Sequence, residues 1–156
     1  MTENEYQLKN GLNIHAVCQK AIYTYGAVHQ KIKAIEELGE LVEAIERYIE
    51  ELPNNVEEET ADVEIMMCQL RKMYQVPDDS VFLNDWTLQH NLNILVIQLG
   101  KLISALARSI NGEEHTVEKS ILLVERAMKR VKYAFDEKLI DEIKLQKLER
   151  LANHIW

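Results

Sequence analysis

Residues that interrupt helices are scarce in this sequence. Its 156 residues include five glycines and two prolines, and aromatic residues make up 6% of the chain. Turns and strands draw on these residues, whereas helices favour the Leu, Ile, Ala, Glu and Lys that dominate here. The composition therefore predicts an all-α protein. At this length a single domain over residues 1–156 is the default.

Cysteines and long apolar runs are also scarce. Cys18 and Cys68 form neither a CxxC motif nor a secretory framework, so we expect two reduced, buried thiols. No run approaches about 18 uninterrupted apolar residues, and the N-terminus lacks the basic and apolar regions of a signal peptide. We therefore expect a cytoplasmic protein without a membrane partner.

Basic residues are outnumbered. The chain has 18 Lys and Arg against 26 Asp and Glu, which gives a net charge of −8. Binding to a nucleic-acid polymer needs a clustered basic surface, and no such cluster stands out in the sequence. We expect no nucleic-acid partner, although a small nucleotide that arrives with its own metal ion is compatible with this charge.

Apolar residues recur at intervals of three and four along most of the chain, which predicts about six helices. The expected ranges are 12–25, 27–52, 56–74, 85–110, 116–135 and 140–155, the last within a C-terminal segment over 137–155. Residues 75–84 read as a connector between two halves. A short turn at Pro53-Asn54-Asn55 folds the second and third helices back on each other as an antiparallel hairpin.

Two pairs of carboxylates are the most informative feature. Glu37 and Glu40 are spaced i, i+3 in the second helix, and Glu59 and Asp62 have the same spacing in the third. This spacing places both members of a pair on one helix face, and the hairpin brings the two pairs together. Glu59 lies on an apolar face, where a charge must be protonated, paired or bound to metal.

Carboxylates without a nearby histidine or thiolate favour Mg²⁺, with Mn²⁺ as the alternative. A helical di-iron site would need Glu-x-x-His repeats, and no histidine stands three residues after a glutamate. A solvated acidic surface accounts for several neighbouring glutamates, but it does not account for Glu59. The paired carboxylates therefore predict a Mg²⁺ site, and the chemistry that follows is phosphoryl transfer or hydrolysis.

The second half of the chain repeats the first. Leu38-Gly39-Glu40 matches Leu99-Gly100-Lys101 at an offset of 61 (99 − 38), and the register continues through the next helix. We interpret residues 12–76 as a catalytic repeat and 85–135 as a degenerate one, so that the bundle contains two tandem helical hairpins. At the four carboxylate positions the second copy has Gln98, Lys101, Ser120 and Leu123. The second copy thus keeps the packing pattern and loses every candidate ligand.

The segment Glu36-Glu37-Leu38-Gly39-Glu40, followed after 18 residues by Glu59-Thr60-Ala61-Asp62, resembles the EExxE…ExxD signature of the all-α nucleoside triphosphate pyrophosphohydrolases. This MazG-like superfamily includes dimeric dUTPases and phosphoribosyl-ATP pyrophosphohydrolase. The likeness covers about residues 12–76, and the second half resembles the family only through the first. It implies that Glu37, Glu40, Glu59 and Asp62 hold Mg²⁺ and that a (d)NTP is hydrolysed to its monophosphate and pyrophosphate.

Further roles follow from this implied reaction. A carboxylate must accept the proton of the attacking water, and Glu36 and Glu43 are both candidates. Lys33, one turn before the first carboxylate pair, is expected to contact phosphate, and Gln30 is a candidate for substrate binding. The sequence does not fix the preferred base or sugar.

The alternative from another class is a catalytically inactive helical module that binds a nucleotide or a protein. On either reading we expect a homodimer or homotetramer, because one hairpin cannot enclose a nucleotide and because the last helix carries a further apolar face. That face consists of Ile140, Ile143, Leu148, Leu151 and Ile155.

Overall fold

The fold is an all-α bundle, as the composition predicts. The computed structural model describes residues 13–77, 84–113 and 116–156, and within these ranges it contains six α-helices, one 3-10 turn and no strand. The helices are α1 (Ile14–Tyr25), α2 (Ala27–Ile49), α3 (Val56–Tyr74), α4 (Leu88–Ile110), α5 (Val117–Val131) and α6 (Glu137–Ile155), and the 3-10 turn is η2 (Lys132–Ala134). Leu12 and residues 78–83 of the expected connector lie outside the described residues.

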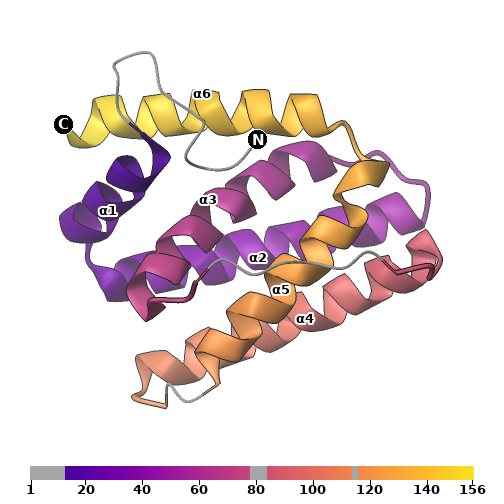
Figure 1. The fold of residues 1–156 in the computed structure, drawn as a ribbon, viewed down its shortest axis with the longest axis horizontal. Helices are drawn as coiled ribbons and strands as arrows, with labels where there is room; N and C mark the ends of the chain where they lie inside the picture. The colour runs from indigo at the N-terminus through magenta and orange to yellow at the C-terminus, as the bar shows by residue number, and fades with distance from the viewer. Residues whose placement is uncertain (1–12, 78–83, 114–115) are drawn as a thin grey trace.

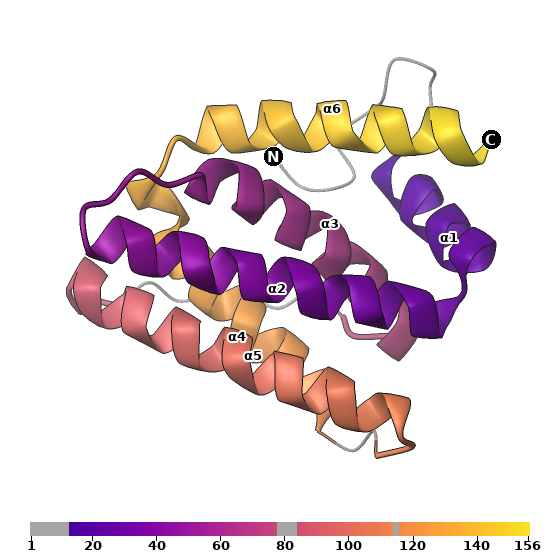
Figure 2. The ribbon, with the colours of Figure 1, turned by 180° about the vertical axis from the view of Figure 1, so that it is seen from behind.

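The helices form two antiparallel hairpins and a covering pair. α2 packs against α3, α4 packs against α5, and the two hairpins meet through α2 with α4 and α3 with α5. α1 and α6 pack against the opposite side of α3 (Figures 1 and 2). α4 begins at residue 88 and α2 at 27, a difference of 61, and the same interval separates their last residues, 110 and 49.

Local side-chain and backbone chemistry fixes the helix ends. Three helices begin at a residue whose side chain accepts a hydrogen bond from the first turn, namely Asn13, Thr87 and Asp136. Gly26, with φ of 89°, separates α1 from α2 in a conformation that favours glycine. α2 ends three residues before the expected Leu52, because Glu51 turns left-handed and the Leu52 N–H donates to the Arg47 carbonyl at 2.9 Å.

The main core lies between the two hairpins. Its largest fully buried residues include Leu38, Leu41 and Ile45 of α2, Leu70 of α3, Leu95, Leu99, Leu102 and Leu106 of α4, and Ile121 of α5. Each such side chain contributes about 1.5–3 kcal/mol by its removal from water. An ion pair between Arg71 and Glu125, at 3.3 Å, joins α3 to α5 at the edge of this core.

A second, smaller core joins α1, α3 and α6. It contains both free cysteines, Cys18 and Cys68, together with Leu148 of α6. On the apolar face of α6, Ile140 and Leu148 are fully buried within the chain, whereas Ile143, Leu151 and Ile155 are only partly buried. Packing on α1 and α3 therefore covers part of this face and holds α6 along the first hairpin.

α4 is long and apolar enough to cross a membrane by length and composition alone, and 33% of its most apolar window is buried in the bundle. Core helices of soluble proteins meet the same criterion.

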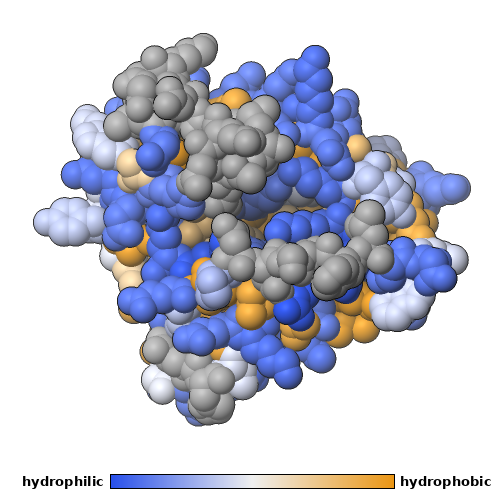
Figure 3. Space-filling model, viewed as in Figure 1, coloured by the Kyte–Doolittle hydropathy of each residue, from blue (hydrophilic) through white to orange (hydrophobic). Residues whose placement is uncertain are grey.

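On the face of the molecule seen in Figure 1, hydrophilic residues predominate, with apolar groups scattered between them (Figure 3).

Candidate active site

A cavity of about 600 Å³ opens between α2, α3 and α6, beside the end of α1. Cavities of this size accommodate small molecules such as nucleotides. Among the described residues, five carboxylates line it, from Glu37, Glu40, Glu58, Glu59 and Asp62, and so do three cations, from Lys33, Lys147 and Arg150. If all are ionised, the formal charge of the lining is −2.

Three of the four predicted ligands converge in this cavity. One carboxylate oxygen from each of Glu37, Glu40 and Glu59 lies within 4.8 Å of the other two. Glu37 and Glu59 are buried, at 9% and 8% exposure, whereas Glu40 is exposed. Such a cluster matches the hard oxygen ligands that Mg²⁺ and Mn²⁺ prefer.

The two buried carboxylates are only half satisfied. Glu59 Oε1 accepts a hydrogen bond from Asn55 Nδ2 at 2.8 Å, and Glu37 Oε1 accepts one from Lys33 Nζ at 3.2 Å. The second oxygen, Oε2, of each carboxylate is buried and has no hydrogen-bond partner among the described residues. Orphaned buried oxygens are costly, so the residues present fit a cation placed between them.

The electrostatics of the cluster also favour added positive charge. Burial is the main cause that raises the pKa of Glu59 to about 7, and the nearby charges of Glu40 and Asp62 raise it further. Burial likewise raises the pKa of Glu37, with a contribution from Asp62, although the hydrogen bond from Lys33 works in the opposite direction. A divalent ion would supply the charge that a proton supplies in its absence.

Asp62, the fourth predicted ligand, lies in the same cavity but is paired with a cation. Lys147 Nζ is 2.7 Å from Asp62 Oδ1 and 3.4 Å from Glu58 Oε1. Burial lowers the pKa of Lys147, but the hydrogen bond and charge of Asp62 outweigh burial and raise it. Asp62 is therefore engaged by Lys147 and is not one of the three clustered carboxylates.

Sequence reasoning assigned no role to Lys147 or Arg150, because both come from α6, far along the chain from the carboxylates. The sequence contains one indication of such a role. Lys147 and Arg150 flank Leu148, which belongs to the apolar face that packs α6 onto the bundle. The two expected proton acceptors do not line the cavity. Glu36 and Glu43 are exposed, and Glu43 pairs with Arg47 at 3.3 Å.

The other end of the cavity is built from amide and aromatic groups. Gln30 is buried and donates through Nε2 to Gln69 Oε1 at 2.7 Å, while its own Oε1 lies 2.9 Å from His29 Nδ1. The His29 ring stacks on Tyr25 with a centroid distance of 5.6 Å. Gln30 is thus placed at the cavity with both of its polar atoms engaged, and Ile65 and Met66 add apolar surface.

No protein-family model matches the chain, and neither the curated proteins nor the solved structures contain a match. The chemistry of the cavity is therefore the ground for assigning a function.

Proposed function

We propose that the protein is a Mg²⁺-dependent nucleoside triphosphate pyrophosphohydrolase, which converts a (d)NTP to the (d)NMP and pyrophosphate. The observation that carries this proposal is the cluster of Glu37, Glu40 and Glu59, with two buried, unpartnered oxygens in a cavity of nucleotide size. The resemblance of the carboxylate motifs to the MazG-like superfamily supports the same reaction.

Glu37, Glu40 and Glu59 are the residues that would hold Mg²⁺, or Mn²⁺ as an alternative. A bound Mg²⁺ supplies positive charge to phosphate oxygens and makes a water molecule more acidic. A divalent ion also offsets the formal charge of −2 that the ionised lining carries. The cavity would then accept the anionic triphosphate with little electrostatic opposition.

The three cations of the lining are candidates for binding phosphate oxygens. Lys33 and Lys147 each pair with a carboxylate, and Arg150 comes from the turn of α6 after Lys147. In our proposal Lys147 exchanges Asp62 for a phosphate of the substrate. Asp62 is then available as a further metal ligand or as the proton acceptor, beside Glu36 and Glu43, which lie outside the lining of the cavity.

The amide and aromatic end is the candidate site for the base. A nucleobase can stack on an aromatic ring and form hydrogen bonds to side-chain amides, and Tyr25, Gln30 and Gln69 offer these groups. Both polar atoms of Gln30 are already engaged, so its contribution is to orient Gln69.

We also propose that the enzyme is a cytoplasmic homo-oligomer, a dimer or a tetramer. Apolar residues that remain exposed support assembly, and they include Val28 and Ile32, one turn apart on α2 and each 54% exposed. The partly buried Ile143, Leu151 and Ile155 of α6 remain candidates for the same contact.

The test is pyrophosphate release from a panel of NTPs and dNTPs, with Mg²⁺ and with EDTA. Glu40→Gln is a suitable negative control, because Glu40 is exposed and its amide should leave the fold unchanged. We expect Mg²⁺-dependent turnover of at least one nucleotide by the wild type and a loss of about 100-fold or more in the variant. No turnover of any nucleotide would overturn the proposal.

The alternative is a binding module that does not hydrolyse its ligand. The 2.7 Å ion pair between Lys147 and Asp62 favours this alternative, because the pair engages one of the candidate metal ligands. Tight nucleotide binding in Mg²⁺ without any product, in the same panel, would select this alternative.

A further inference from the structure

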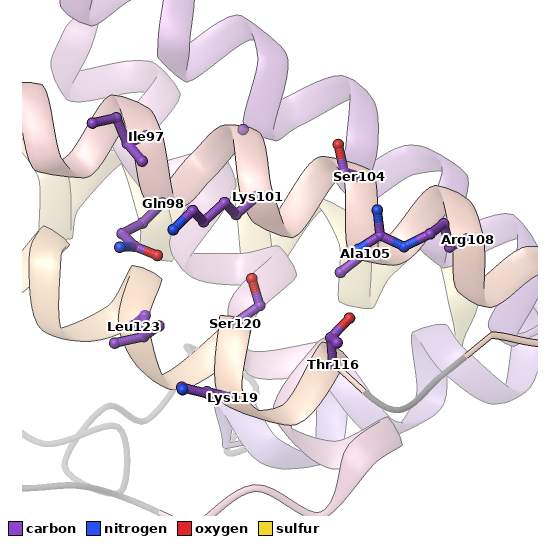
Figure 4. A pocket seen from close by; sticks show the side chains of 11 residues that line it. Ile97, Gln98, Lys101, Ser104, Ala105, Arg108, Thr116, Lys119, Ser120 and Leu123 are labelled. Atoms are coloured by element: carbon purple, nitrogen blue, oxygen red, sulfur yellow. The ribbon is translucent and has the colours of Figure 1, made fainter.

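A second cavity, of about 610 Å³, lies between α4 and α5 in the second hairpin. Its lining includes Gln98, Lys101, Ser120 and Leu123, which stand at the positions of the four carboxylates in the first hairpin (Figure 4). In place of the carboxylates, Gln98 and Ser120 are neutral and polar, Leu123 is apolar and Lys101 is basic. The second hairpin keeps a cavity at the matching place while its chemistry is changed.

This cavity is positively charged in a protein of net charge −8. Among the described residues, the lining contains Lys101, Arg108 and Lys119 and no carboxylate. None of the ion pairs among the described residues involves these three cations. A lining with three cations and no counter-charge attracts anions, above all anions that carry several charges.

Neutral groups in the same cavity also lack partners. Ser120 is 7% exposed, and its buried Oγ has no hydrogen-bond partner in the described part of the chain. Figure 4 shows this hydroxyl on α5 facing α4, with Gln98 and Lys101 extending between the two helices. The buried Oε1 of Gln98 is also unpartnered, and rotation of the amide would present its NH₂ group instead. Both residues can therefore donate to a ligand oxygen.

The start of α5 adds to the positive potential of the cavity. Thr116, Lys119 and Ser120 belong to its cap and first turn and all line the cavity. The Thr116 side chain accepts no hydrogen bond from that turn. No capping side chain therefore offsets the positive end of the helix dipole at the first N–H groups. Helix N-termini with free N–H groups bind phosphate oxygens in many proteins.

We infer that the cavity between α4 and α5 binds a phosphate chain, held by Lys101, Arg108 and Lys119 at its charged oxygens and by the Ser120 hydroxyl at its buried end. Two or more linked phosphates match three cations better than a single phosphate does. The site is separate from the carboxylate cavity, requires no metal, and stands whether or not the first cavity hydrolyses nucleotides.

The experiment is a calorimetric titration of inorganic pyrophosphate into the full chain in EDTA, where metal-dependent binding in the carboxylate cavity is abolished. We expect the Lys101→Ala/Lys119→Ala pair to weaken binding at least about tenfold and Ser120→Ala about threefold. The matched control is Lys20→Ala/Lys138→Ala, which removes the same charge from α1 and α6 and should change the dissociation constant less than about twofold. Glu59→Gln should bind pyrophosphate as the wild type does.

Two results would overturn the inference: no binding by the wild type, or equal weakening by the test pair and the control pair. Circular dichroism of each variant verifies the fold. The four lysines are exposed or partly exposed, so their replacement by alanine should not disturb it. A parallel titration with ATP identifies the source of the phosphate chain. Tighter binding of ATP than of pyrophosphate assigns the site to a nucleotide, and equal affinity assigns it to the phosphate chain alone, provided that both depend on Lys101 and Lys119.

Discussion

Replacement of Glu59 by glutamine separates the metal-binding role of this side chain from its structural one. Glu59 is buried, its Oε1 accepts a hydrogen bond from Asn55, and its Oε2 has no partner among the described residues. Glutamine has the same shape and can keep the bond from Asn55 through its own oxygen. It removes the charge, which is unfavourable in metal-free protein and useful only when a cation is bound.

The size of the effect follows from the pKa of Glu59. Burial and neighbouring carboxylates raise this pKa from 4.5 to about 7, so the folded protein binds the proton more tightly than the unfolded chain does. The free energy of unfolding of metal-free wild type must then fall as pH rises from 4.5 to about 7. A shift of this size corresponds to about 3 kcal/mol, and water in the open cavity reduces it to about 1–2 kcal/mol.

Urea denaturation followed by circular dichroism in EDTA measures this difference. At pH 8 we expect Glu59→Gln to be more stable than wild type by about 1–2 kcal/mol, and the gap should close toward pH 4.5. Addition of Mg²⁺ should stabilise the wild type and leave the variant nearly unchanged, since only the native site binds the ion. A variant less stable than wild type at pH 8 in EDTA would refute the reasoning.

Three further outcomes are expected. Lys147→Ala should free Asp62 from its ion pair, so that calorimetry shows Mn²⁺ binding tightened several-fold while KM for the nucleotide rises about tenfold. An unchanged metal affinity would show that the ion pair does not restrain Asp62. Lys101→Glu and Ser120→Glu, each alone, should create no metal site in the second hairpin, because Mg²⁺ needs several oxygens at once; new binding by either would contradict this. Light scattering at micromolar concentration should give a mass above the 18.2 kDa of one chain, and a fully active monomer would exclude assembly.

Much of the fold could be predicted from local sequence patterns. The bounds of α3 match the expected 56–74, because apolar periodicity and the Pro53 turn both act over short distances. Glu59 could be singled out for the same reason, since a carboxylate on an apolar helix face conflicts with its surroundings. The early end of α2 could not be predicted, because Glu51 adopts a left-handed conformation that glycine usually supplies.

The rest of the candidate site depends on how α6 docks. No local pattern shows that the segment around Leu148 lies along the first hairpin, so the ion pair of Lys147 with Asp62 could not be predicted from the sequence. Glu36 and Glu43 were chosen for residue type and proximity in sequence, and their exposure on α2 follows from the packing of that helix between α3 and α4.

Phosphorus NMR of the reaction products tests the central claim most directly. A (d)NTP that turns over in the panel is incubated with wild type in Mg²⁺, with wild type in EDTA, and with Glu40→Gln in Mg²⁺. The account predicts equal amounts of (d)NMP and pyrophosphate in the first sample and unchanged nucleotide in the other two. Release of inorganic phosphate with a nucleoside diphosphate, or the same products at the same rate in EDTA, would contradict it.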